Sequence, residues 1–315
     1  MHAASTTRLG NSAVDVTRLA AGTATLGNVF GEVDETAASD LLAACESSGI
    51  TYLDTAPLYG VGLSEGRLGA ALREHDPSAF VISTKVGRTL DESTPRGWVH
   101  DFSRDAILRG FDSSLTRLGR EYCDVVYLHD PDDYEDQVYE SAWGALIELR
   151  EQGRVGAIGV GVNQWELPLR LIRRLPLDVV LLAGRYTLLD TSGAGELLPE
   201  CLERGVSVAL GGVFNSGVLI DPKPGSWFDY RPASAEVLSR ARAIKSVAEN
   251  HGITLPHLAI SFAAAHPAVT STIVGVATAE ALTNNVESMD TPVDEAVWHE
   301  LDALGLLPEH QFVIP

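Results

Sequence analysis

Four ionisable side chains stand at or just beyond the ends of apolar stretches of the sequence. They are Asp54, Tyr59, Lys85 and His129. A tyrosine hydroxyl ionises near pH ~10, too high to exchange protons efficiently at neutral pH. A lysine cation beside it favours the phenolate, and a carboxylate beside the lysine keeps that lysine charged. A neutral imidazole can then orient a substrate oxygen. The chemistry that uses such a set is hydride transfer at a carbonyl or carbinol carbon, with Tyr59 as the acid or base.

Lys85 is the most informative of the four residues. The chain has 23 basic residues, and only three of them are lysines. A guanidinium cannot replace a compact ammonium in lowering a neighbour's pKa, so a lysine that ends an apolar strand here indicates a function. The other three residues each have a structural alternative, namely a helix cap for Asp54, packing for Tyr59 and a hydrogen-bonded core histidine for His129.

Eight short apolar stretches are the elements that position these residues. Their patterns are continuous rather than alternating, which is typical of strands covered on both faces. The predicted strands are Leu19–Gly22, Ile50–Leu53, Phe80–Thr84, Cys123–Leu128, Val155–Val160, Asp178–Ala183, Val206–Leu210 and Ser271–Gly275. Each is followed by helix-sized sequence, which favours an α/β fold, a closed (β/α)8 TIM barrel, over an open sheet. We expect one domain over residues 1–315, with the four side chains at the carboxyl-terminal face.

Four stripes of apolar residues at three-to-four spacing predict helices between the strands. They run from Ser103 to Gly119, from Asp34 to Gly49, over Val138–Leu149 and over Val237–Ala248, with Ser103 and Asp34 as predicted caps.

Two segments fit neither pattern. Arg8–Arg18 alternates around Gly10 and predicts an N-terminal β-hairpin that plugs one mouth of the barrel. Pro222–Pro232 is a loop long enough to act as a lid.

Composition restricts the partners of the protein. The 43 acidic residues exceed the basic ones and give a net charge of −20, which repels nucleic acid and anionic membranes. The three cysteines are isolated, so we expect small buried hydrophobes in a reducing compartment, and a cytoplasmic protein. We expect a small-molecule substrate, no bound metal, and a monomer or weakly associating homo-oligomer.

Three stretches resemble the aldo-keto reductases: Tyr52–Gly60, Ser83–Gly87 and Asp124–His129. The likeness extends from the hairpin at the start of the chain to Asn284–Asn285, and all four members of that family's catalytic tetrad are present in order. The resemblance implies a barrel that binds a nicotinamide cofactor without a Rossmann domain, in agreement with the lack of a GxGxxG motif after any predicted strand.

The resemblance also implies where the cofactor binds. Gly22, Thr23 and Asp54 would border the nicotinamide ribose, Asn163 would hold the carboxamide and Tyr186 would stack on the nicotinamide ring. The remaining contacts would be Gly212, Val213, Phe214, Ser216 and Gly217 to the pyrophosphate, then Gly275, Val276, Ala281, Asn284 and Asn285 after the eighth strand.

Two positions depart from the family's pattern at the carboxamide. The family usually has a Ser–Asn pair after the fifth strand, whereas Gly161–Val162–Asn163 contains an extra residue. It also usually has a glutamine three residues before the stacking tyrosine, and Ala183 stands there.

A third departure concerns the choice between NAD and NADP. Members that use NADP hold its 2′-phosphate with basic residues after the eighth strand. The matching stretch, Gly275–Asn285, contains no lysine or arginine, and Glu280 would repel a phosphate. We therefore predict NAD as the cofactor, with NADP less favoured, and oxidation as the working direction.

Parts of the sequence most resemble a bacterial branch with D-threo-aldose 1-dehydrogenases, L-fucose dehydrogenases and pyridoxal 4-dehydrogenases. We predict oxidation of an aldose at C1 to the lactone, with a pyridoxal 4-dehydrogenase or a general aldehyde or ketone reductase as alternatives. Expected substrate contacts are Tyr59, Trp98, His129 and Asp130. A non-catalytic binding subunit has no need for the complete tetrad, and a metal-dependent barrel hydrolase needs more His, Asp or Glu at strand ends.

Overall fold

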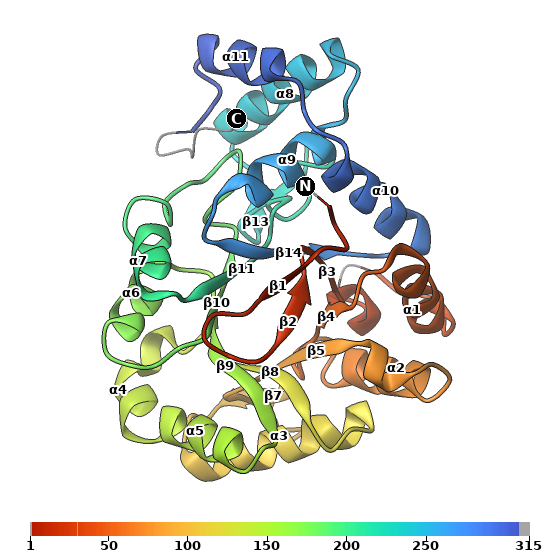
Figure 1. Ribbon diagram of the computed structural model, residues 1–315. Coiled ribbons are helices and arrows are strands. Elements are labelled where there is room, and N and C mark those ends of the chain that lie inside the picture. The colour runs from red at the N-terminus through yellow and green to blue at the C-terminus, as the bar shows by residue number, and fades with distance from the viewer. Residues whose placement is uncertain (1, 30, 309–315) are drawn as a thin grey trace.

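A closed barrel of eight parallel strands forms the centre of the computed structural model, which describes residues 2–29 and 31–308 (Figure 1). Neighbouring strands follow the chain order, and the last pairs with the first to close the barrel. They are β3 (Leu19–Gly22), β4 (Tyr52–Asp54), β5 (Val81–Val86), β8 (Cys123–His129), β9 (Val155–Val162), β10 (Val179–Ala183), β11 (Ser207–Gly211) and β14 (Val269–Gly275). All eight predicted strands are confirmed, with small differences at their ends.

Helices surround the barrel and bury their apolar stripes against the outer faces of the strands (Figure 1). They are α1 (Ala37–Ser48), α2 (Leu63–Leu72), α3 (Arg104–Leu118), α4 (Glu135–Gln137), α5 (Trp143–Glu151), α6 (Glu166–Ile172), α7 (Leu197–Arg204), α8 (Ala235–Asn250), α9 (Leu255–Ala265), α10 (Ala279–Asp290) and α11 (Glu295–Ala303). Within the described ranges, none has the length and apolar character needed to cross a lipid bilayer.

The predicted helix boundaries hold for α3 but not for α1. Ser103 Oγ accepts a hydrogen bond from the Ala106 amide at 3.3 Å, and α3 ends at Gly119 in the left-handed conformation. The predicted cap at Asp34 is wrong, because α1 begins only at Ala37. The main-chain carbonyl of Asp34 instead accepts from the Ala37 amide at 3.1 Å, in a turn that precedes the helix.

The other two predicted helices are present as well. The stripe that begins at Val138 first forms a π-helical turn, Val138–Ala142, and continues in α5. Its apolar members are fully buried. The stripe that begins at Val237 lies in α8, which Ser234 caps by accepting from the Val237 amide at 3.2 Å.

The predicted hairpin closes the amino-terminal mouth of the barrel. Strands β1 (Thr6–Arg8) and β2 (Asp15–Thr17) pair antiparallel and cross the barrel mouth that faces the viewer in Figure 1. Leu9 and Val16 are completely buried and pack against side chains of the barrel interior. Gly10 has φ +52°, and a Cβ atom there would lie 2.1 Å from the carbonyl oxygen of Asp178, next to the start of β10.

Two small antiparallel hairpins lie on loops that follow the carboxyl ends of strands. One consists of β6 (Arg88–Leu90) and β7 (Trp98–His100). The other, β12 (Trp227–Phe228) with β13 (Arg231–Pro232), occupies the loop predicted as a lid, and we call Trp227–Pro232 the strap. Asp229 of the strap forms an ion pair with Arg185 at 3.0 Å, which holds the strap in place.

The three cysteines are free and buried, as the sequence predicts for Cys45, Cys123 and Cys201. Burial raises the pKa of each thiol to about 12, which keeps it protonated and unreactive.

Candidate active site

The four predicted catalytic side chains meet at the carboxyl ends of three adjacent strands. Asp54 is the last residue of β4, Lys85 lies in β5 and His129 ends β8. Because these strands are parallel neighbours in the barrel, their carboxyl ends bring the three side chains together. Tyr59 arrives from the loop between β4 and α2, and its hydroxyl accepts from Lys85 Nζ at 3.2 Å.

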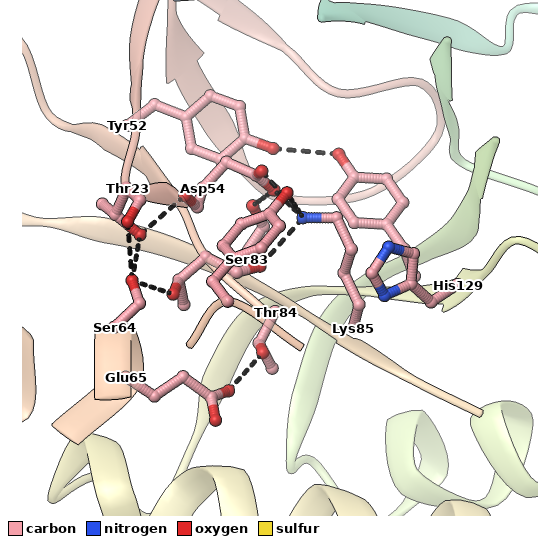
Figure 2. A network of polar contacts seen from close by, with 12 residues as sticks. Thr23, Tyr52, Asp54, Ser64, Glu65, Ser83, Thr84, Lys85 and His129 are labelled. Carbon is pink, nitrogen blue, oxygen red and sulfur yellow. Dashed lines mark hydrogen bonds and ion pairs between the residues drawn. The ribbon is translucent and has the colours of Figure 1, made fainter. Parts of the chain in front are cut away.

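A buried ion pair forms the centre of the site (Figure 2). Lys85 Nζ donates to both carboxylate oxygens of Asp54, at 2.7 and 2.9 Å, and to the Thr55 carbonyl at 2.9 Å. The side chains of Lys85 and Asp54 are only 3% and 4% exposed. Burial disfavours the ammonium, but Asp54 and Tyr59 outweigh it and raise the pKa of Lys85 above its ordinary value. The lysine is therefore a permanent cation.

The environment of Tyr59 differs from the sequence-based expectation. Burial raises the pKa of Tyr59 to about 12, although the Lys85 cation acts in the opposite direction. The expected net stabilisation of the phenolate is therefore absent, because desolvation of the anion outweighs the attraction of the lysine. At neutral pH, Tyr59 is a protonated hydroxyl that can donate to a substrate oxygen.

His129 is held in its neutral form. Burial, followed by the cations Lys85 and Arg88, lowers the pKa of His129 well below its usual range. Its ring meets the Tyr59 ring edge-on, with centroids 6.5 Å apart. Its Nδ1 atom has no hydrogen-bond partner among the described residues. A neutral imidazole in this position can donate one hydrogen bond and accept another.

A set of buried hydroxyls lies behind the ion pair, and the sequence analysis singled out only Thr23 among them, as a cofactor contact. Ser83 Oγ donates to Asp54 Oδ1 at 2.7 Å, and Thr23 Oγ1 donates to the Asp54 carbonyl at 3.1 Å. Ser64 Oγ lies 2.9 Å from Thr23 Oγ1 and 3.1 Å from Thr55 Oγ1, which joins α2 to the two strands (Figure 2). The bonds fix Asp54 in place. Serine and threonine are too common for these positions to stand out in a sequence.

The predicted substrate contacts Trp98 and Asp130 belong to one side of the site. Asp130 forms an ion pair with Arg88 on β6, and its carboxylate is 14% exposed. The Arg88 guanidinium lies over the Trp98 ring, 5.0 Å from its centroid. The sequence analysis missed Arg88, which connects the two predicted contacts.

Some of the predicted cofactor residues line two cavities. The inner cavity is lined by Asn163, Ala183, Gly184, Gly212, Asn215, Ser216, Asp229 and Tyr230. The outer groove has a volume of about 830 Å³, and its lining includes Phe214, Gly275, Ala281, Asn284 and Asn285. A groove of this size is typical of ligand sites. The side chains of Val213 and Val276 are buried, and neither residue is part of these linings.

Gly22 and Thr23 lie where β3 runs alongside β4, and the Thr23 amide donates to the Asp54 carbonyl at 2.9 Å. Gly217, at φ +95°, ends the turn that begins at Gly212. A Cβ atom on Gly212 would lie 2.8 Å from the Gly184 amide nitrogen, so the close approach of these loops requires glycine.

The predicted role of Tyr186 is wrong. Tyr186 is 0% exposed, and its ring stacks on Phe262 of α9 with centroids 5.0 Å apart. The neighbouring residue, Arg185, turns toward the barrel mouth instead and donates to the Asn163 carbonyl at 2.7 Å. Tyr186 therefore packs in the layer between barrel and helices, where it cannot stack on a nicotinamide.

The outer groove also contains a cation that the sequence analysis missed. Lys245 of α8 lines it together with Glu249 and Glu287. Lys245 Nζ lies 3.3 Å from an Asp221 carboxylate oxygen and 3.9 Å from one of Glu249. Glu280 is exposed and is not part of the lining. The groove thus offers one lysine, already paired with carboxylates.

These residues fit a nicotinamide dinucleotide. The inner cavity contains a buried amide oxygen, Asn215 Oδ1, that has no partner among the described residues. Asn163 of this cavity contacts Asp130, the residue after His129, and the outer groove is lined in part by residues of α10. Across residues 2–29 and 31–308, no group of three or more His, Cys, Asp or Glu side chains is arranged to hold a metal ion.

Comparison with known proteins identifies the family of the chain. The sequence profile of the Aldo/keto reductase family matches residues 18–305. A pyridoxal 4-dehydrogenase from Microbacterium luteolum is 37% identical, over 95% of this chain and 97% of its own. A D-threo-aldose 1-dehydrogenase from a Pseudomonas species is 36% identical, over 91% and 93%. An aldo-keto reductase from Bacillus halodurans, solved in its holo form, shares the fold with a TM-score of 0.80, 24% identity and 98% of each chain covered. The chain belongs to the aldo/keto reductase family of oxidoreductases.

Proposed function

We propose that this protein oxidises an aldose at C1 to the corresponding lactone, with NAD as the hydride acceptor. The observation that carries the proposal is the contact of Tyr59 with the buried Lys85–Asp54 pair beside a neutral His129. The 36% identity to a D-threo-aldose 1-dehydrogenase supports the substrate class.

Each of the four catalytic side chains has a separate role in this reaction. His129 and Tyr59 hold the C1 hydroxyl between them, and Tyr59 takes its proton as the C1 hydrogen leaves as hydride. Lys85 favours the phenolate that accepts this proton, and Asp54 keeps Lys85 charged. A bound nicotinamide supplies the carbon that receives the hydride. The sugar loses two electrons and two hydrogens, and its hemiacetal becomes a lactone.

The charges in the outer groove support NAD rather than NADP as the cofactor. A 2′-phosphate needs charge-assisted donors, and Lys245 already pairs with Asp221 and Glu249. Trp98 and Asp130 are proposed to line the substrate side of the site, with Arg88 between them.

A pyridoxal 4-dehydrogenase is the second candidate, because a relative with that activity in its name is 37% identical over almost the whole chain. Both reactions oxidise a cyclic hemiacetal to a lactone, so the catalytic residues would have the same roles.

A spectrophotometric panel tests the proposal. The purified protein is incubated with NAD or NADP and each of a set of aldoses, including L-fucose, and with pyridoxal, while reduction of the nicotinamide is followed. We expect an aldose to give the highest kcat/KM, and Tyr59→Phe to abolish the signal. A higher kcat/KM for pyridoxal would assign the second function, and activity only in the direction of carbonyl reduction would overturn both.

A further inference from the structure

Asp130 joins two walls of the site. Its Oδ2 atom accepts from Arg88, which lies over Trp98 on the substrate side. Its Oδ1 atom accepts from Asn163 Nδ2 at 3.2 Å, on the wall of the inner cavity. The carboxylate thus contacts both sides of the site through different oxygens.

The backbone holds Asp130 in this position. It has φ +43°, in the left-handed region that residues other than glycine rarely adopt. Its amide donates to the Gly161 carbonyl in β9 at 2.8 Å. Such a conformation persists where the surroundings enforce it, and here it directs the carboxylate from the end of β8 toward the residues after β9.

The contact with Asp130 fixes the polarity of the Asn163 amide. A carboxylate only accepts hydrogen bonds, so the NH2 group of Asn163 faces Asp130 and its Oδ1 faces elsewhere. That oxygen accepts no hydrogen bond from the residues that the structure describes. Arg185 holds the main chain of Asn163 by donating to its carbonyl at 2.7 Å. Asn163 is therefore an oriented acceptor.

A second acceptor lines the same cavity. Asn215 is 4% exposed, and its Oδ1 atom is likewise without a partner in the described part of the chain. The rest of the lining comprises Ala183, Gly184 and Gly212, which have no polar side-chain atom, together with Ser216, Asp229 and Tyr230. Two acceptors without donors suit a group that carries two N–H bonds on one nitrogen, which is a primary amide.

We propose that Asp130 is a positioning residue that orients Asn163, which the family resemblance already assigns to the nicotinamide carboxamide, and that Asn215 is a second acceptor for the N–H bonds of that carboxamide. The inference rests on the proposed function, because it takes a nicotinamide dinucleotide as the ligand. The family usually has a glutamine at the position of Ala183. In this chain Asn215 would supply the amide oxygen that Ala183 lacks. Through Arg88 and Asp130, the substrate wall is mechanically linked to the cofactor wall.

A pair of dinucleotides tests the amide directly. In 3-acetylpyridine adenine dinucleotide a methyl ketone replaces the carboxamide, so both N–H donors are lost while the ring and the adenosine half remain. Dissociation constants are measured from quenching of tryptophan fluorescence, without substrate or turnover. We expect the wild-type protein to bind NAD at least about tenfold more tightly than the analogue, since two hydrogen bonds are lost.

Variants then separate the two asparagines from Asp130. In Asp130→Asn the new amide turns its oxygen to Arg88 and its NH2 to Asn163, which forces Asn163 to present NH2 to the cavity. The preference for NAD should then fall to about parity. Asn215→Ala should reduce the preference for NAD about threefold, because one hydrogen bond is lost. Asp133→Asn removes the same charge from an exposed position of the same segment and should leave the ratio unchanged.

A double variant tests whether Asp130 acts through Asn163. Asp130→Asn combined with Asn163→Ala should lose no more of the preference than Asn163→Ala alone, because coupled residues are not additive. An unchanged preference in folded Asp130→Asn would overturn the positioning role, and an unchanged preference in Asn215→Ala would overturn the second acceptor. Asn215→Ala does not alter a buried charge. Its dissociation constants for the two dinucleotides can therefore be measured even if Asp130→Asn fails to fold. A wild-type protein that binds neither dinucleotide would instead refute the proposed function.

Discussion

The ammonium of Lys85 bridges both carboxylate oxygens of Asp54, at 2.7 and 2.9 Å, where neither side chain is more than 4% exposed. Removal of one partner from such a pair leaves an unpaired buried charge, whereas the intact pair is a fixed dipole beneath the Tyr59 hydroxyl. The charges nearest to the Tyr59 hydroxyl therefore come from a pair of side chains that hold each other in place.

Tyr59→Phe should keep the fold and the affinity for NAD while kcat falls by about 10²-fold or more, because only the proton-transfer group is removed. Unfolding by urea and quenching of tryptophan fluorescence by NAD serve as controls. Turnover within a few-fold of the wild type would remove Tyr59 from its assigned role.

The pKa of about 12 for Tyr59 predicts opposite pH dependences for the two directions. Oxidation needs the phenolate, so its kcat/KM should rise about tenfold per pH unit between roughly pH 7 and 10. Reduction needs the protonated hydroxyl and should be nearly independent of pH over the same range. Initial rates in both directions, with the most active substrate pair, provide the measurement. A plateau of the oxidation rate near neutral pH would show that a group with a much lower pKa accepts the proton.

Lys85→Met should slow oxidation at every pH, because loss of the cation raises the pKa of Tyr59 further. The double variant Asp54→Asn, Lys85→Met removes both charges and controls for the unpaired carboxylate. In Lys85→Ala, added methylammonium should restore part of the rate, and methanol should not. Equal rescue by both solutes would indicate that the lysine only fills space.

NAD should be preferred over NADP by at least about tenfold in kcat/KM, or about 1.4 kcal/mol, which is less than one charged hydrogen bond contributes. Ala281→Arg should raise the use of NADP more than it changes the use of NAD. Lys245→Ala tests the one lysine of the groove and should weaken NADP binding while NAD binding stays within about threefold. Equal or tighter binding of NADP by the wild-type protein contradicts the assignment.

Gly10→Ala tests the hairpin that closes the amino-terminal mouth. Its Cβ atom would lie 2.1 Å from the Asp178 carbonyl at φ +52°, so we expect a loss of about 2–4 kcal/mol in the free energy of unfolding. Gly153→Ala has a similar φ of +70° with nothing within 4 Å, and it should cost only about 1–2 kcal/mol. Urea unfolding measures both, with kcat/KM of the folded variants unchanged. Equal losses at the two glycines would mean that the hairpin is not tightly docked.

The correct predictions concern features that depend on a single strand and its place in the barrel. Continuous apolar stretches predicted the eight strands, and a residue that ends a parallel strand necessarily lies at the carboxyl face, which brought Asp54, Lys85 and His129 together. The failures depend on which way a loop side chain turns. Tyr186 and Arg185 are adjacent, yet only contacts with α9 and Asn163 decide which of them enters the site. Arg88, Asn215 and Lys245 escaped for the same reason, because their surroundings come from distant segments.

The pKa of Tyr59 could not be predicted for a different reason. Its value reflects a balance between the attraction of Lys85 and the desolvation of the hydroxyl. A sequence identifies the cation but gives no measure of how much solvent the loop excludes.

The hairpin closes the amino-terminal mouth of the barrel, so the carboxyl-terminal face is the open end. Leu9 and Val16 fill the amino-terminal end, so the open face is the one bordered by Trp98 and the strap. A cofactor and a substrate must therefore approach the catalytic cluster from the same side of the barrel.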